Sequence, residues 1–188
     1  MTLMIGAVVE GHGEVGALPV LLRRICQDHG IFDVTVSKPH RLPRAEMTRE
    51  KVSAAVRMQR LRVGTSGVVV VLYDSDDDEP AAVRRQTLDV LGDNQAVVAV
   101  AVREYEAWFL AALRSLRKHE HVRDDATFEG DPESPRDAKG RLSDVMTEKY
   151  RETLHQARFS AVMSLAEARE NSASFSVFEQ HLLKALGH

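Results

Sequence analysis

The stretch VVVVLYDSDDDEP, residues 68–80, places a run of β-branched residues directly before a cluster of acids. An apolar run without alternation is typical of a strand buried on both faces, as in a parallel sheet covered by helices. Pro80 fits the first turn of a following helix, where its missing N–H costs little. The stretch therefore predicts a strand over Val68–Tyr73, an acidic loop, and a helix that continues over Ala81–Leu91.

Three further short apolar runs and two helical stripes flank this stretch. The predicted strands cover Met4–Val9, Ile31–Val36 and Ala96–Val102, and the stripes cover Leu18–Ile25, which Gly30 ends, and Met47–Leu61. Alternating strands and helices predict a parallel sheet with right-handed crossovers. We therefore expect an α/β fold with a mostly parallel four-stranded sheet flanked by helices.

The last third of the chain has a different pattern. After the acidic, proline-containing loop Phe128–Asp137, everything is predicted to be helical: Ala138–Tyr150, a turn near Leu154, Phe159–Glu170, and a helix over Ser174–Leu186 that Ser174 caps. These short stripes could hardly bury themselves alone. We therefore expect an α/β domain over residues 1–120 and a helical extension over residues 121–188 packed on it.

Composition limits the classes of protein that the chain resembles. Its 188 residues carry a formal net charge of −3, so there is no global basic field of the kind that marks many nucleic-acid binders. The single cysteine, Cys26, cannot form an internal disulfide, and no apolar run approaches the roughly 20 residues of a membrane span. We expect a cytoplasmic protein without a membrane association.

Acids follow three of the predicted strands. They are Glu10 with Glu14, Asp74 to Asp78, and Glu104 with Glu106. Parallel sheets bind ligands outside the carboxyl ends of their strands. Two carboxylates 4 Å apart repel by roughly 4 kcal/mol at an effective dielectric near 20, so such a cluster favours a neutralising cation. Oxygen ligands suit Mg²⁺ or Mn²⁺. We interpret Glu10, Asp74 and Asp76 as metal ligands.

Each of these acids also has a plain structural interpretation. Asp77, Asp78 and Glu79 are placed to cap the next helix or to favour its dipole. Glu14 fits a first helical turn, and Glu104 and Glu106 fit an exposed helix start. Gly11 and Gly13 would let a phosphate or metal approach the backbone closely. A calcium loop is excluded because the sixth position after Asp74 is not glycine.

Basic residues are grouped although the total charge is not basic. The segment from Lys38 to Arg62 holds far more basic than acidic residues, and Arg84, Arg85 and Arg103 lie close in sequence to the acidic strand ends. Two interpretations stay open: a solvated helix face, and a track for a phosphate backbone that leads to bound metal. For the second, the nucleic-acid-binding candidates are Arg44, Arg57, Arg84 and Arg103.

The ordered motifs resemble a known family. Glu followed by Gly after the first strand and D-x-D after the third look like the Toprim domain of topoisomerases, primases, recombination proteins and OLD-type nucleases. Five segments that together span nearly the whole chain resemble the DUF4276 group of small Toprim-like bacterial proteins: VVEGHGE, LYDSDDD, REYEAWFLA, SPRDAKGRL and SASFSVFEQHL.

This resemblance implies roles for individual residues. Glu10 would be a metal ligand or general acid/base, and Asp74 and Asp76 metal-binding aspartates. The OLD-type arrangement adds candidates for a second ion: Glu14, Asp78, Glu104 and Glu106. Trp108 and Phe109 match no chemical role and are interpreted as packing.

The function expected from these motifs is a nuclease that hydrolyses DNA or RNA with one or two Mg²⁺ or Mn²⁺ ions. The alternative is a binding or regulatory module that is inactive alone and works with a partner such as an ATPase. Homo-oligomerisation is left open. A D-x-D nucleotide-sugar transferase is less favoured, because no signal for a sugar-nucleotide pocket is evident.

Overall fold

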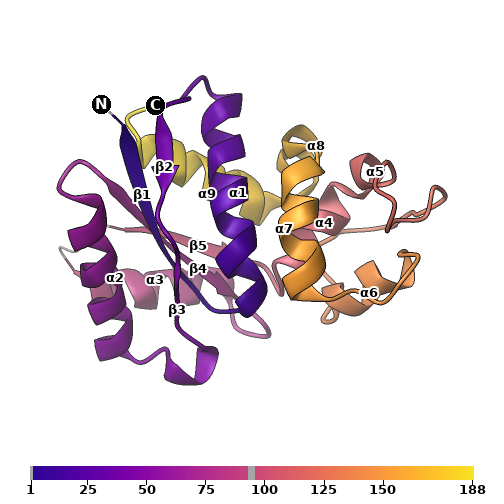
Figure 1. Ribbon diagram of the computed structural model, residues 1–188. Coiled ribbons are helices and arrows are strands. Elements are labelled where there is room, and N and C mark those ends of the chain that lie inside the picture. The colour runs from indigo at the N-terminus through magenta and orange to yellow at the C-terminus, as the bar shows by residue number, and fades with distance from the viewer. Residues whose placement is uncertain (1, 93–95) are drawn as a thin grey trace.

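The computed structural model describes residues 2–92 and 96–188, and within them five parallel strands form one sheet (Figure 1). The strands are β1 (Leu3–Val9), β2 (Val34–Val36), β3 (His40–Arg41), β4 (Val68–Asp74) and β5 (Val97–Ala101). Their order is β2-β1-β4-β5, and β3 also pairs with β1. The predicted α/β fold with a parallel sheet is confirmed.

The sheet has five strands instead of the predicted four, because β3 lies in what the sequence indicated to be a loop. β2 ends with Val36 opposite Ile5, and β3 begins with His40 opposite Val8, so both lie along the same edge of β1. Pro39 stands between them and has no N–H to donate to β1. The edge strand is thus interrupted at Pro39 and resumes for two residues, too few for a recognisable apolar run.

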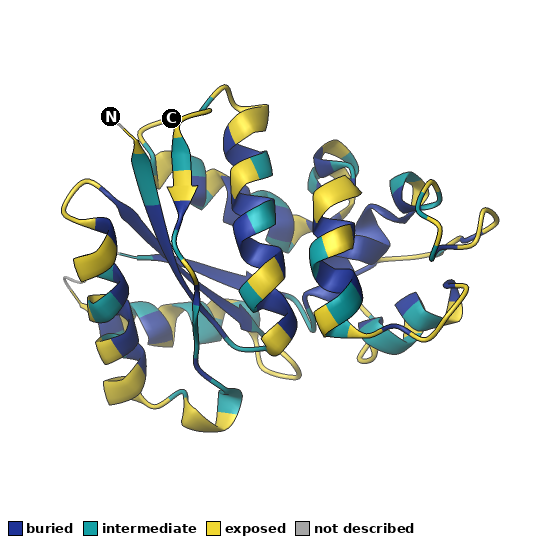
Figure 2. Ribbon diagram, in the orientation of Figure 1, coloured by how far each residue is buried: buried dark blue, intermediate teal, exposed yellow. Residues whose placement is uncertain are grey.

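Helices cover both faces of the sheet. On one face lie α2 (Arg49–Val63) and α3 (Pro80–Leu91); on the other lie α1 (His12–Asp28) and α9 (Ala173–Ala185). Alternate residues of β4 enter the two cores, Val69 and Val71 toward α2 and α3, and Val70 and Leu72 toward α1 and α9. Figure 2 shows the central strands as almost entirely buried. Burial on both faces explains the continuous apolar run in the sequence.

The remaining helices extend the core beside α1. They are α4 (Glu106–Ala111), α5 (Leu113–Leu116), α6 (Ala138–Asp144), α7 (Glu152–Val162) and α8 (Leu165–Asn171). The short 3₁₀ helix η1 (Arg44–Glu46) lies between β3 and α2 and has no buried residue. α7 lies alongside α1, and α9 packs on β5 (Figure 1). Residues before and after position 120 share one hydrophobic core. The division of the chain into domains at residue 120 stays a prediction.

Trp108 and Phe109 are fully buried, which confirms their interpretation as packing residues. The indole of Trp108 lies between Phe175 and Phe178, with ring centroids 5.4 and 5.6 Å away, and donates its N–H to Ser174 Oγ over 2.8 Å. Ser174 lies inside α9, where its hydroxyl also bonds to Glu133, and the cap of α9 is Ser172 and not Ser174. Tertiary packing overrides the local capping signal here.

Three other expectations for the tail were wrong in detail. The helix predicted over Ala138–Tyr150 ends at Asp144. Leu154 lies inside α7 and not in a turn, and the predicted helix Phe159–Glu170 is divided where Ser164 caps α8 through the N–H of Glu167. Elsewhere local signals held: Gly30 has a φ of 77° directly after α1, a conformation that favours glycine. None of the helices in residues 2–92 and 96–188 is long and apolar enough to cross a membrane.

Candidate metal centre at the carboxyl edge of the sheet

The parallel topology brings the three acidic strand ends to one edge. Glu10 follows β1, Asp74 is the last residue of β4, and Glu104 and Glu106 follow β5. Since β4 lies between β1 and β5, with Val9 opposite Leu72 and Asp74 opposite Ala101, these ends are neighbours in space. The sheet edge therefore gathers carboxylates from segments far apart in the sequence.

Two acids of this edge, Glu14 and Glu106, are joined by hydrogen bonds from the tail. Gln156 on α7 donates its amide to Glu14 Oε1 over 3.2 Å and to Glu106 Oε1 over 3.1 Å. The Tyr150 hydroxyl donates to the same Glu106 oxygen over 2.8 Å. Asp74 Oδ1 accepts the Tyr105 backbone N–H over 2.9 Å. The packing of α7 on α1 thus completes the acidic cluster.

Burial and mutual repulsion make these carboxylates easier to protonate. Removal from water raises the pKa of Glu10 and Glu14, and raises that of Asp74 well above its usual range, where nearby Glu106 and Glu14 add to the effect. Burial raises the pKa of Glu106 to about 7. The edge therefore holds negative charge that the surrounding residues do not fully compensate.

Two buried carboxylate oxygens at this edge, Glu10 Oε2 and Glu106 Oε2, have no hydrogen-bond partner within the described residues. Buried polar atoms are normally satisfied by protein, water or an ion. Carboxylate oxygens are the hard ligands that Mg²⁺ and Mn²⁺ prefer. The residues present at this edge fit a divalent metal ion.

Arg44 of η1 lies among the acids of this edge. Its guanidinium donates to the carbonyl oxygen of Asp74 over 2.9 Å and to Asp78 Oδ2 over 2.8 Å, and lies 3.6 Å from Glu10 Oε2 and 3.9 Å from Asp76 Oδ2. Arg44, which the sequence suggested as a nucleic-acid contact, thus supplies positive charge at the place where the sequence predicts a metal ion. Asp78 and Asp76 are brought together through Arg44.

The acidic run after β4 divides among several partners. Asp77 pairs with Arg103 over 2.8 Å and with Arg136 over 3.3 Å, so it does not serve the start of α3. Glu79 does, because its carboxylate accepts the N–H groups of the first turn of α3. Asp76 has a φ of 49°, a left-handed conformation that Asp tolerates better than most residues.

Lys139 at the start of α6 belongs to the site although sequence reasoning did not single it out. Its backbone N–H donates to Glu104 Oε2 over 2.9 Å, and its ammonium lies 2.8 Å from Glu152 Oε1. The carboxylates of Glu106 and Glu152 raise its pKa further above the usual lysine value. Lys139 lies in SPRDAKGRL, one of the five segments that resemble the DUF4276 group, and this was the only sequence signal that could have identified it as a site residue. Tyr150 and Gln156 had no such signal.

The four basic candidates do not gather in one place. Arg44 and Arg103 lie at the acidic edge. Arg57 is exposed on α2, and Arg84 lines a pocket with Val68 and Val97, at the opposite edge of the sheet. A continuous basic track from Arg57 to the acids is not evident among the described residues. Nucleic-acid contact by these arginines stays a prediction.

Two other groups of side chains in the described part could offer ligands to a metal. The ligand atoms of His121, Glu148 and His155 lie within 4.8 Å of one another. However, His155 Nδ1 accepts the Arg151 N–H, and His121 Nε2 faces the Arg158 guanidinium. The other ring nitrogens, His155 Nε2 and His121 Nδ1, each lie 3.0 Å from the Glu148 carboxylate, so all three side chains already have partners within the chain.

The second group joins Asp28, His29 and Glu179. Its two carboxylates already bind the Arg169 guanidinium, which offsets one of their two negative charges. Among the described residues, the acids of the sheet edge do not form a group whose ligand atoms all lie as close together as in these two groups. Arg44 lies between several of these acids. We nevertheless place the candidate metal centre at the sheet edge, because two buried carboxylate oxygens at this edge, Glu10 Oε2 and Glu106 Oε2, lack hydrogen-bond partners within the described residues.

The glycines after β1 serve packing within the chain. A Cβ at Gly13 would lie 2.1 Å from Gln156 Oε1 and 2.9 Å from Glu152 Cβ, so this glycine lets α7 approach α1. Gly11 donates its N–H to the Glu14 carboxylate in a capping box. The close approach predicted at these glycines is thus made by side chains of the protein itself.

Gly13→Ala is therefore expected to destabilise the fold by about 1–3 kcal/mol, since α7 must move away from α1. Gly16→Ala in the same helix is the matched control. Its Cβ would lie 3.6 Å from Ala157 Cβ, an ordinary contact, and alanine is the better helix former by roughly 1 kcal/mol. Urea unfolding of both variants measures the difference. Equal stability would contradict the role given to Gly13.

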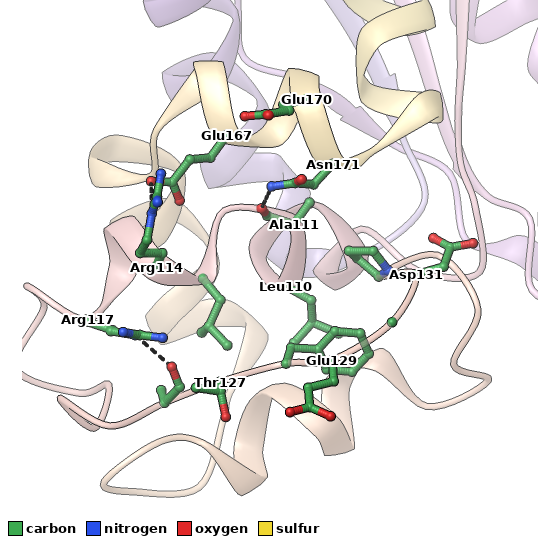
Figure 3. Close-up of a pocket in the computed structure, with 15 residues that line it drawn as sticks. Leu110, Ala111, Arg114, Arg117, Thr127, Glu129, Asp131, Glu167, Glu170 and Asn171 are labelled. Carbon is green, nitrogen blue, oxygen red and sulfur yellow. Dashed lines mark hydrogen bonds and ion pairs between the residues drawn. The ribbon is translucent and has the colours of Figure 1, made fainter.

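A cavity of about 730 Å³ lies away from this edge, between α4, α5, α8 and the loop over residues 126–132 (Figure 3). Arg114 pairs with Glu167 over 3.2 Å, and Arg117 donates to the carbonyl oxygen of Ala126 over 2.7 Å. With both arginines engaged, the remaining charged lining is acidic: Glu129, Asp131 and Glu170. None of the predicted site residues lines this cavity.

Comparison with known proteins gives a family. Two solved structures are similar at 17% sequence identity. The match to the C-terminal region of the Burkholderia pseudomallei OLD protein covers 100% of this chain and 98% of the solved chain, with a TM-score of 0.44. The match to the C-terminal region of the Xanthomonas campestris pv. campestris OLD protein covers 97% of this chain and 95% of the solved chain, with a TM-score of 0.41.

No curated protein matches the chain. The family model described as "Domain of unknown function (DUF4276)" matches residues 9–183, which is nearly the whole sequence. This match confirms the resemblance found in the sequence motifs. The chain belongs to the DUF4276 family.

Proposed function

We propose that this protein is a divalent-metal-dependent nuclease of the Toprim type, which hydrolyses phosphodiester bonds of DNA or RNA. One observation carries the proposal: partly and fully buried carboxylates from three strand ends meet at the carboxyl edge of the sheet, and two of their buried oxygens lack hydrogen-bond partners. A cluster of this kind costs stability unless a cation neutralises it. Structural carboxylates at helix starts would not need to be gathered in this way.

The ligands proposed for a first ion are Glu10, Asp74 and Asp76. Glu14 and Glu106 are proposed for a second ion, with Asp78 and Glu104 nearer the periphery. A divalent ion held there would supply Lewis-acid stabilisation of the phosphoryl oxygens. The choice between Mg²⁺ and Mn²⁺, and between one ion and two, is part of the test below.

The protein's own residues would bind substrate and move protons. Glu10, with a raised pKa, is proposed either as a metal ligand or as the general acid–base. Glu106, with a pKa of about 7, would be suited to acid–base work near neutral pH only when it does not hold a second ion. The Lys139 ammonium lies beside the acids and would stabilise negative charge on a phosphoryl group. Arg44 and Arg103 would contact the phosphate backbone once a metal ion has taken over the carboxylates that they pair with.

The test is hydrolysis of DNA and RNA by the wild-type chain with Mn²⁺, with Mg²⁺ and with chelator. Wild type is expected to be active only with metal, and Asp76→Asn is expected to be at least about tenfold slower, because a ligand is lost. Asp89→Asn, an exposed aspartate on α3, is the matched control and should be as active as wild type. Equal activity in Asp76→Asn and wild type would rule out the assignment.

A second candidate is a module that is inactive alone and works with a partner protein such as an ATPase. The contacts of Arg44 favour it, because a guanidinium already supplies positive charge between Glu10, Asp76 and Asp78. A thermal shift with Mn²⁺ separates the two, since a ligand at 100 times its dissociation constant stabilises by about 2.7 kcal/mol. Absence of a shift would favour the module. Cytoplasmic location and homo-oligomerisation stay predictions.

A further inference from the structure

A second charged site lies at the opposite edge of the sheet from the acids. It is a cavity of about 630 Å³ bordered by the first residues of β4 and β5, Val68 and Val97, and by α2, α3 and α9. β4 has seven residues, so at about 3.3 Å per residue the two edges are roughly 20 Å apart. The cavity is thus separate from the candidate metal centre.

The charged side chains that line this cavity are basic. Arg84 comes from α3, His181 and Lys184 come from α9, and Arg60 comes from α2, where it donates to the carbonyl oxygen of Gly67. Among the described lining residues there is no aspartate or glutamate. Four basic groups from three helices therefore converge on one concave space in a chain whose net charge is −3.

Two of these groups have unsatisfied polar atoms. Arg84 Nε and His181 Nδ1 are buried and have no hydrogen-bond partner in the part of the chain that the structure describes. Leaving a buried donor unpaired costs about 1–3 kcal/mol, and more for a charged group, so an external partner is favoured. Burial lowers the pKa of His181, and the positive charges of Arg84 and Lys184 add to the effect.

The other walls of the cavity suit an organic group. Leu88 and Leu91 of α3 form an apolar side, while Thr65 and Ser66 bring hydroxyls from the loop before β4. The volume falls in the range of small-molecule sites, which combine apolar walls with a few convergent polar groups.

We propose that this cavity binds a small phosphate monoester with an apolar body, the chemistry of a mononucleotide. The phosphate would lie against Arg84 and Lys184 and satisfy the buried Arg84 Nε, while the apolar body would lie against Leu88 and Leu91. The binding needs no metal ion and does not depend on the proposed nuclease activity. The site would make the protein responsive to a phosphorylated small molecule.

The experiment is isothermal titration of the full chain with adenosine 5′-monophosphate in excess EDTA, so that metal cannot bridge the ligand to the acidic edge. Wild type is expected to bind it, inorganic phosphate to compete, and adenosine without phosphate not to bind. Arg84→Gln and Lys184→Gln should each weaken binding at least about tenfold, because a charge-assisted hydrogen bond is lost. Asp76→Asn should leave binding unchanged.

Arg85→Gln is the matched control, because Arg85 is exposed on the same helix but does not line the cavity. Circular dichroism of each variant checks that it is folded. The proposal is overturned if folded wild type binds no adenosine 5′-monophosphate at millimolar concentration, if Arg84→Gln and Arg85→Gln bind equally well, or if adenosine binds as tightly as its monophosphate. Binding that disappears in EDTA would also overturn it.

Discussion

Asp74→Asn is expected to lower metal-dependent hydrolysis by at least about a hundredfold while making the metal-free protein more stable. The loss of activity follows because Asp74 is a proposed ligand at the centre of the cluster, and Lewis-acid stabilisation is worth several kcal/mol of barrier. The gain in stability follows because the pKa of Asp74 is raised well above its usual range, so its charged form is disfavoured in the folded state.

Asparagine keeps the local structure at this position. Its amide oxygen can still accept the Tyr105 N–H that now binds Asp74 Oδ1, while the negative charge beside Glu106 and Glu14 is removed. The unfolding free energy at pH 7.5 should therefore be higher in Asp74→Asn than in wild type. Urea unfolding in EDTA and turnover with Mn²⁺ measure the two effects separately.

The matched comparison is Asp76→Asn. Asp76 is exposed and lies 3.9 Å from Arg44, so its ion pair contributes at most about 1 kcal/mol, and asparagine tolerates the same positive φ. Asp76→Asn should therefore lose activity without gaining stability. If Asp74→Asn lost both activity and stability, its role would be structural and the metal assignment of Asp74 would be wrong.

The metal-free protein is also expected to lose stability as the pH rises from about 4.5 to above 7. Burial raises the pKa of Glu106 from 4.5 to about 7, so the folded state binds a proton more tightly than the unfolded state. Stability falls with pH wherever the folded state binds more protons. The contribution of Glu106, about 3 kcal/mol, is fully present below pH 4.5 and has been lost by the time the pH has passed 7.

Glu106→Gln isolates this contribution. Glutamine can still accept from Tyr150 and Gln156 but does not titrate, so its unfolding free energy should fall less between pH 5 and pH 8 than that of wild type. Urea unfolding in EDTA at both pH values gives the difference, with the exposed Glu50→Gln as control. Mn²⁺ should restore wild-type stability at pH 8. Identical pH dependence in wild type and Glu106→Gln would contradict the raised pKa.

The positions of the long strands could be predicted because a strand that is buried on both faces consists of consecutive apolar residues, which is a local pattern. Val68–Tyr73 lies within β4 as the structure has it, and Pro80 begins α3. β3 was missed because a two-residue strand beside Pro39 has no pattern. Ser174 was mistaken for the cap of α9, but it lies inside the helix and its hydroxyl bonds to Trp108, a residue 66 positions away.

The sequence by itself determined that the acids after β1, β4 and β5 reach one edge, because parallel strands in a covered sheet present their carboxyl ends together. Only the tertiary structure decided what surrounds them: Arg44 between Glu10 and Asp78, and Gln156 joining Glu14 to Glu106. It also decided that Arg84 faces the other edge. The reason is physical, since strand burial is a property of neighbouring residues, whereas these contacts depend on how distant helices pack.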